Sequence, residues 1–245
     1  YFGEMAEVVF EHGGILDKYI GDAIMAVFGT PFPSDQDADN AVCTAIRMRD
    51  VLTALNARRG NRGQTPFEIR IGINSGDVVA GNIGSSRRMD YTVIGDGVNT
   101  AARLESANKQ LGTTILLSES TRAALKGDYV LREIDLVRVT GRILPVSVYE
   151  VRGMGSELAS IKEERLLDAF ARGVNYYRDR AWSQAMVAFQ RALEIEPGDQ
   201  PSALMLDRAL RYLSEPPPQD WDGVWPLPHK YSVYAAICLS PLMSA

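Results

Sequence analysis

Two hydrophobic periodicities divide the chain into expected helices and expected strands. Met5, Val8 and Val9 recur at the three-and-four spacing of an amphipathic helix, which predicts a helix over residues 1–12. The same spacing predicts a longer helix with a broad apolar face over residues 37–57. Stretches rich in glycine or containing proline separate these segments from their neighbours and mark where each helix should end.

Short runs of β-branched and aromatic residues predict strands. These runs cover residues 15–20, 23–28, 68–74, 78–81, 91–94, 114–117, 129–136 and 146–151. Gly21 and Asp22 join the first two runs, which predicts a tight hairpin with Asp22 at its tip. Because helices and strands alternate while hairpins interrupt them, the fold class expected for residues 1–152 is α+β. We expect a mixed α/β sandwich with a partly antiparallel sheet.

Residues 89–105 combine a strand, a Gly-Asp-Gly corner and a helix. Asn99 and Arg103 are four apart in the expected helix and therefore project from one of its faces. An amide and a guanidinium on one helical turn can hold a phosphate, so this stretch is the first candidate site. The alternative is that Arg103 only pairs with a surface carboxylate, either Asp96 or Glu105.

Composition excludes some classes of function. Hydrophobic residues make up 46% of the 245 positions and the formal net charge is −5, so nothing indicates the basic face of a nucleic-acid-binding protein. Cys43 and Cys238 lie far apart and form no metal or disulfide pattern, which suits a reducing compartment. No run reaches the roughly 18 apolar residues of a membrane helix. The chain starts without Met inside an amphipathic pattern, so we expect it to be part of a longer protein.

A second, all-helical unit is expected over residues 157–215. Apolar faces predict three helices, with turns near residues 179–181 and 197–199. The first two resemble a single tetratricopeptide repeat, although Ala169 and Arg172 replace its usual Trp and Leu. One repeat cannot bury its apolar face alone, so we expect it to contact the first unit, a second copy or another protein. A plain helical hairpin is the alternative.

Three motifs in order give residues 1–152 a specific resemblance. They are LDKYIGDAIMAVFG at residues 16–29, IGINSGDVVAGNIG at residues 71–84, and the stretch at residues 89–105. Together they resemble the catalytic domain of class III nucleotidyl cyclases. A match of three motifs in the same order is far more specific than a match of one short pattern. The resemblance implies a ferredoxin-like sandwich that converts ATP to 3′,5′-cyclic AMP and pyrophosphate in signal transduction. It also implies a homodimer through the cyclase domain.

The resemblance assigns recognition of the base to Lys18 and Thr92. Adenylyl members carry a Lys and a Thr or Asp at these positions, whereas guanylyl members carry Glu and Cys. A Lys ammonium can donate to adenine N1, and a Thr hydroxyl can accept from the 6-amino group. The expected substrate is therefore ATP, and guanylyl cyclase activity is disfavoured. Taken alone, Lys18 would be an ordinary strand lysine and Thr92 an ordinary β-former.

The resemblance also assigns phosphate and metal residues. Asn99 would orient the ribose, and Arg103 would neutralise charge on the α-phosphate. Arg142 would bind the triphosphate, although the sequence around it matches the family motif less closely. Asp22 matches one of two metal-binding aspartates, and a carboxylate at a hairpin tip suits Mg²⁺ or Mn²⁺, although turn chemistry alone also explains it. The complete enzyme would hold two ions per site, which assist in-line attack of the 3′-hydroxyl. One protomer would supply the metal ligands and the other the remaining residues.

The chain departs from the family at the second metal aspartate. In relatives that residue belongs to a first strand, several tens of residues before the hairpin, which this sequence does not contain. We therefore expect residues 1–245 to be inactive and poorly stable, with an exposed edge beside the missing strand. Asp17, Asp77 or Asp96 would be the nearest replacement ligand if the chain is active. The alternative function is a non-catalytic cyclase-homology module for dimerisation or regulation.

Residues 216–245 form a tail that contains proline and tryptophan. Its run of three prolines is expected to be extended. The tail resembles the ends of bacterial cyclases that carry an N-terminal sensor and a membrane anchor, which implies a catalytic domain on the cytoplasmic side. Residues 231–245 are apolar but too short to span a bilayer, and we assign them no function.

Overall fold

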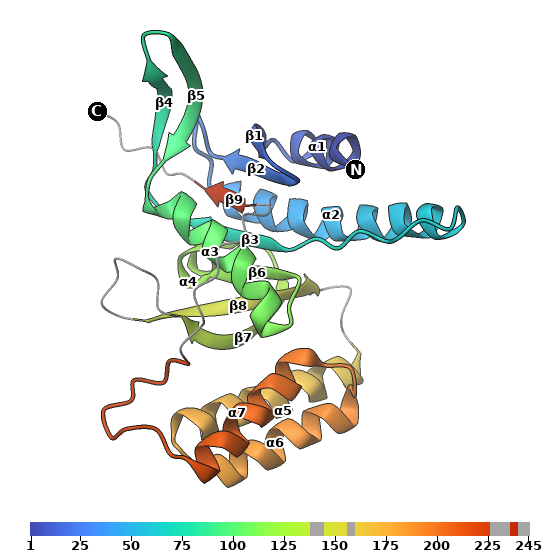
Figure 1. Cartoon of the computed structure of the whole chain (residues 1–245), viewed down its shortest axis with the longest axis vertical. Coiled ribbons are helices and arrows are strands. Elements are labelled where there is room, and N and C mark those ends of the chain that lie inside the picture. The colour runs from blue at the N-terminus through green and yellow to red at the C-terminus, as the bar shows by residue number, and fades with distance from the viewer. Residues whose placement is uncertain (138–144, 156–159, 226–235, 240–245) are drawn as a thin grey trace. The chain divides into compact units, whose positions relative to one another are not determined.

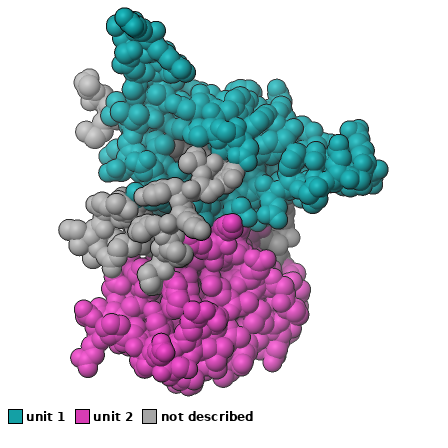
Figure 2. Space-filling view, in the orientation of Figure 1, with its two compact units in different colours: residues 1–108, 114–127, 230–245 teal, residues 109–113, 128–229 magenta. Residues whose placement is uncertain are grey.

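The computed structural model describes residues 1–137, 145–155, 160–225 and 236–239, and the chain divides into two compact units (Figures 1 and 2). Unit 1 comprises residues 1–108, 114–127 and 230–245, and unit 2 comprises residues 109–113 and 128–229. The helices are α1 (Phe2–Glu11), α2 (Asp37–Gly60), α3 (Asp96–Leu111), α4 (Glu119–Ala124), α5 (Ile161–Arg178), α6 (Trp182–Ile195) and α7 (Gln200–Ser214). The strands are β1 (Ile15–Ile20), β2 (Ala23–Phe28), β3 (Ile71–Ser75), β4 (Val79–Ser85), β5 (Arg88–Ile94), β6 (Ile115–Ser118), β7 (Tyr129–Val137), β8 (Val146–Met154) and β9 (Ala236–Leu239). Within the described ranges, no helix is both long and apolar enough to cross a membrane.

The sheet of unit 1 has the strand order β1-β2-β9-β3-β6. β1 and β2 are antiparallel, whereas β2, β9, β3 and β6 run parallel to one another. Every residue of β2 is buried, and so are residues 71–74 of β3. Continuous burial is typical of parallel strands covered on both faces. The predicted α+β fold with a partly antiparallel sheet is confirmed for this unit.

β9 overturns one prediction about this sheet. The sequence predicted an exposed edge beside a missing strand, and it assigned no function to the end of the tail. Instead, residues 236–239 pair with residues 25–28 of β2 and with residues 72–75 of β3. These stretches of β2 and β3 therefore have strand neighbours on both edges, and the prediction of an exposed edge there is wrong. Local patterns could not reveal the pairing because it joins segments far apart in the sequence.

Helix α3 packs directly across β3 because Gly72 has no side chain. A Cβ atom at Gly72 would lie 2.1 Å from the Ala101 carbonyl oxygen and 2.3 Å from the Glu105 amide nitrogen. Further along α3, the buried Asn108 side chain donates to the Ile71 carbonyl oxygen at 2.9 Å. The start of α3, which carries two candidate site residues, is thereby fixed on the central sheet.

Replacing Gly72 by alanine should destabilise the protein by about 2 kcal/mol, because the added methyl group would overlap backbone atoms of a helix. Gly81→Ala is the matched control, since a Cβ atom at Gly81 on β4 meets nothing within 4 Å. Denaturant unfolding should give a lower midpoint for Gly72→Ala than for Gly81→Ala. Equal midpoints would contradict the close contact between α3 and β3.

β4 and β5 form a separate antiparallel ribbon that projects from the rest of unit 1 (Figure 1). At its base, Val93 packs with Met25 and Val27 of β2 in a buried cluster. The ribbon also carries exposed apolar side chains, namely Val79, Met89, Tyr91 and Ile94. Because side chains alternate along a strand, Met89 and Tyr91 lie on one face of the ribbon, and the paired Val79 and Ile94 lie on the other.

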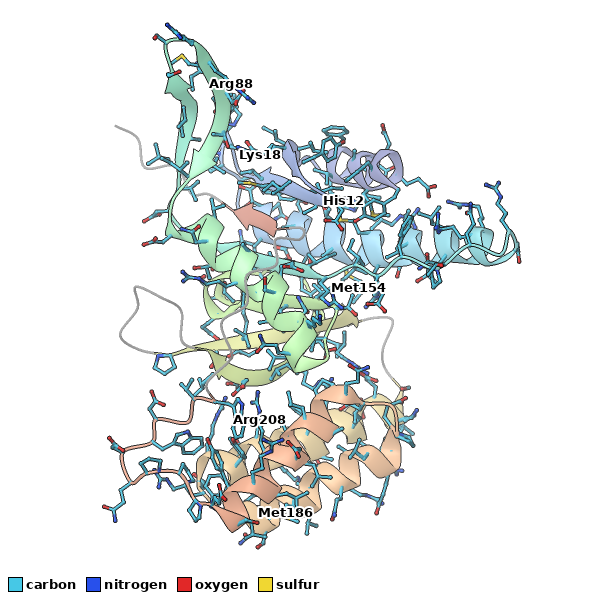
Figure 3. The ribbon with its side chains drawn as sticks, viewed as in Figure 1. His12, Lys18, Arg88, Met154, Met186 and Arg208 are labelled. Carbon is cyan, nitrogen blue, oxygen red and sulfur yellow. The ribbon has the colours of Figure 1, made fainter. Side chains whose placement is uncertain are left out.

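Buried ion pairs connect the β7–β8 hairpin of unit 2 to its helices. The Arg132 guanidinium lies 2.6 Å from a carboxylate oxygen of Glu150 on β8 and 2.8 Å from one of Asp199, which caps α7. Arg208 of α7 (labelled in Figure 3) pairs with Asp135 of β7 at 2.6 Å. Since removing one partner would leave a buried charge uncompensated, these pairs favour a single arrangement of hairpin and helices. The three predicted helices are confirmed, whereas the tetratricopeptide assignment stays a prediction.

Candidate active site

Lys18 on β1 and Thr92 on β5, the two expected base readers, belong to different sheets but share one carboxylate. Thr92 Oγ1 donates to Asp17 Oδ2 at 2.9 Å, and Lys18 Nζ lies 3.3 Å from the same oxygen. The side chain of Asp17 is 5% exposed, whereas that of Lys18 is 43% exposed. Figure 3 labels Lys18, which lies near the base of the β4–β5 ribbon. The fold thus brings β1 and β5 together at a partly open polar cluster.

The corner before α3 is held by a buried amide. Asn74, at the end of β3, donates from Nδ2 to the Gly97 carbonyl oxygen at 3.0 Å. Gly95 has φ of 147°, a conformation that favours glycine. Ser120 Oγ donates to the Asn74 side-chain oxygen at 3.3 Å, which orients the amide. The turn from β5 into α3 is therefore fixed by residues on two other elements of unit 1, β3 and α4.

Asn99 and Arg103 lie on successive turns of α3, as the helical spacing predicted. Asn99 is exposed and Arg103 is partly buried. The alternative interpretation, in which Arg103 only pairs with Asp96 or Glu105, stays a prediction, although the Glu105 side chain is fully buried rather than at the surface. An exposed amide and a partly buried guanidinium on one face of a helix can both donate hydrogen bonds to the oxygens of a ligand.

Asp22 lies at the exposed tip between β1 and β2, as predicted. Burial raises the pKa of the Tyr1 hydroxyl, and the nearby Asp22 carboxylate raises it further. In the part of the chain that the structure describes, no group of three or more His, Cys, Asp or Glu side chains could hold a metal ion. Mg²⁺ needs several oxygen ligands, so Asp22 alone does not build a complete metal site. No metal-dependent step follows from the described residues.

Arg142, the expected triphosphate ligand, lies outside the described residues, within the stretch 138–144. Its role in binding phosphate stays a prediction.

Sequence reasoning did not identify Asp17, Asn74 or Gly72 as parts of this site, and it considered Asp17 only as a replacement metal ligand. One signal for Asp17 was present. Asp17 and Lys18 are consecutive polar residues in a strand, which breaks the alternation of a half-buried strand and indicates a bulge. Gly72 had a weaker signal, since a glycine inside a strand pattern indicates close approach of another backbone. Asn74 had no local signal, because its role depends on α3, which follows later in the chain.

Comparisons with known proteins agree on one family. A family model described as the adenylate and guanylate cyclase catalytic domain matches residues 2–153. An adenylate cyclase from Anabaena cylindrica is 42% identical over 159 residues, which cover 62% of this chain and 31% of that protein. Among solved structures, the guanylyl cyclase Cya2 is 36% identical with a TM-score of 0.57, covering 65% of this chain and 80% of that one. The adenylyl cyclase CyaB from P. aeruginosa is also 36% identical, with a TM-score of 0.56 and coverages of 63% and 82%.

The matched region is a small part of the longer relatives. The chain spans 10%, 31% and 23% of the lengths of three curated adenylate cyclases that it resembles. The solved structures include both an adenylyl and a guanylyl cyclase at equal identity. The choice between ATP and GTP must therefore come from the residues of the site.

Proposed function

Because this chain belongs to the family of adenylate and guanylate cyclase catalytic domains, we propose that it acts on ATP and forms cyclic AMP and pyrophosphate in signal transduction. The observation that carries the choice of ATP is the pair Lys18 and Thr92, held at one carboxylate. Lys18 offers donors and no acceptor, which suits N1 of adenine but opposes the N1–H of guanine. The Thr92 hydroxyl oxygen can accept from the 6-amino group.

Asn99 and Arg103 supply the chemistry that this chain can contribute at the phosphate end. In-line attack of the ribose 3′-hydroxyl on the α-phosphorus forms the cyclic phosphodiester and breaks the bond to the oxygen bridging the α- and β-phosphorus, which leaves with pyrophosphate. Asn99 orients the ribose, and Arg103 neutralises charge that develops on the α-phosphate. Catalysis of phosphoryl transfer depends chiefly on such positioning and charge stabilisation. Asp22 would be one ligand of a divalent ion, Mg²⁺ or Mn²⁺, whose site other residues must complete.

We place the complete site at the interface of a homodimer. The exposed apolar residues of the β4–β5 ribbon support association of the cyclase domain with a second copy. Lys18 and Asp22 would then serve different sites of the dimer.

We also propose a protein contact for the helices of unit 2, supported by a groove of about 620 Å³ between α5 and α6 that Tyr176 and Val187 help to line. A tetratricopeptide-like repeat would present such a surface.

Arg103→Ala should weaken ATP binding by about tenfold to a hundredfold, because it removes charged hydrogen bonds worth about 1.5–3 kcal/mol. Lys109→Ala is the matched control, since Lys109 is an exposed cation near the other end of the same helix. Displacement of a fluorescent ATP analogue measures both variants. Equal affinities for the two variants would contradict the role given to Arg103.

One observation favours the alternative, a non-catalytic cyclase-homology module. The described residues provide Asp22 without a cluster of further metal ligands. In that case the domain would bind a nucleotide or a second copy without turnover even as part of an extended protein. Formation of cyclic AMP by such an extended protein would exclude the alternative.

A further inference from the structure

Asp17 occupies an irregular position in β1. The antiparallel pairing matches Leu16 with Ala26 and then Lys18 with Met25, so Asp17 has no partner on β2. The extra residue of such a β-bulge changes the direction in which its side chain points relative to a regular strand. At Asp17, the redirected carboxylate is buried and accepts a hydrogen bond from Thr92 on β5.

This hydrogen bond fixes the chemistry of the Thr92 hydroxyl. A hydroxyl has one proton to donate and two lone pairs that accept, and rotation normally lets it adapt to either kind of partner. An ionised carboxylate can only accept, so the Thr92 proton is directed at Asp17 Oδ2 at 2.9 Å. Toward any further partner, Thr92 is then restricted to accepting.

The restriction distinguishes the two purines. The 6-amino group of adenine donates, whereas the 6-oxo group of guanine accepts. A freely rotating hydroxyl could hydrogen-bond with either group. A hydroxyl whose proton is donated to Asp17 can only accept, and it can therefore pair only with the amino group. Asp17 also lies 3.3 Å from the Lys18 ammonium, the other expected reader of the base. A site that leaves a buried polar group unpaired rejects the wrong ligand strongly.

We propose that Asp17 is a specificity-determining positioning residue, which makes Thr92 an obligatory acceptor and so selects 6-aminopurine nucleotides over 6-oxopurine nucleotides. The proposal rests on the proposed function, since it needs the base to lie against Lys18 and Thr92. Asp17 itself does not touch the nucleotide. It acts through the direction of a hydrogen bond.

The test is a double-mutant cycle on residues 1–245, read as the ratio of ATP to GTP affinity in displacement of a fluorescent ATP analogue. Asp17→Ala should lower this ratio by about fivefold to tenfold, chiefly through tighter GTP binding. In a Thr92→Val background, Asp17→Ala should leave the ratio unchanged, because there is no hydroxyl to orient. Asp90→Ala is the control, since Asp90 is an exposed carboxylate on the same strand as Thr92 and pairs with Arg88.

A merely structural role for Asp17 predicts a different result. Loosening of β1 against β5 would weaken ATP and GTP binding together and leave their ratio unchanged, which would overturn the proposal. An equal change of ratio with and without Thr92 would overturn it as well. If Asp17→Ala does not fold, Asp17→Asn keeps the size of the side chain and should lower the ratio in the same direction, because its amide can donate to Thr92.

The same assay distinguishes failure of the proposed function from failure of the role given to Asp17. A wild-type protein that binds neither nucleotide, or binds ATP and GTP equally, overturns both the choice of ATP and the role of Asp17. A wild-type preference for ATP that Asp17→Ala leaves intact overturns only the role of Asp17.

Discussion

Removal of residues 226–245 should destabilise unit 1 by about 4 kcal/mol or more. The deletion takes away β9, which lies between β2 and β3 and pairs with both. β2 is buried along its whole length, so the backbone groups left without partners would lie away from water. Each buried unsatisfied group costs about 1–3 kcal/mol, whereas a whole domain is stable by only about 5–15 kcal/mol. The shortened protein should therefore be partly unfolded at room temperature.

Hydrogen exchange of the β2 and β3 amides measures this effect locally. We expect protection of residues 25–28 and 72–75 to fall sharply after the deletion, while α5 to α7 keep theirs. Ile237→Pro tests the same strand without shortening the chain, because proline cannot donate a hydrogen bond inside a sheet. Ile237→Val is its control. Unchanged protection in both the deletion and the proline variant would show that the tail does not serve as a sheet strand.

Residues 1–245 should bind an ATP analogue weakly and yet form no cyclic AMP above background. The proposed function assigns the nucleotide to Lys18, Thr92, Asn99 and Arg103, and it assigns a two-metal site to Asp22, for which the described residues provide no cluster of further ligands. Loss of one metal should remove several kcal/mol of transition-state stabilisation, enough to suppress measurable turnover.

A sensitive cyclic AMP assay, with Mg²⁺ and separately with Mn²⁺, checks this expectation while analogue displacement shows that the protein is competent to bind. Robust turnover would mean that another carboxylate completes the metal site with Asp22, with Asp77 and Asp96 as the first candidates. Asp17 is a poorer one, because its carboxylate is buried and engaged with Thr92 and Lys18.

The sequence predicted the local elements of unit 1 well because each has its own signal. The hairpin at Gly21 and Asp22 and the strand-corner-helix at residues 89–105 both follow from turn residues and periodicity. The predicted ends of the strands were less accurate. β3 begins at Ile71 rather than at Glu68, and β4 extends to Ser85, since pairing partners rather than propensity set where a strand ends.

Features that join distant parts of the chain could not be predicted in this way. The placement of β9 depends on free strand edges at β2 and β3, and nothing in four apolar residues specifies those neighbours. Arg208 of α7 is 2% exposed and paired with Asp135 of β7, and the helical pattern of residues 200–214 alone does not specify that partner. The hydrogen bond from Thr92 to Asp17 likewise requires β1 and β5 to be adjacent, which no local pattern encodes.

Competition between ATP and GTP for the nucleotide site tests the choice of substrate most directly. On the wild-type chain, ATP should displace a fluorescent analogue at a concentration at least about tenfold lower than GTP does, because Lys18 and Thr92 match adenine and leave guanine with unpaired polar groups. Changing Lys18→Glu and Thr92→Cys together should erode that preference. Equal displacement by ATP and GTP on the wild-type chain would contradict the assignment of ATP as the substrate.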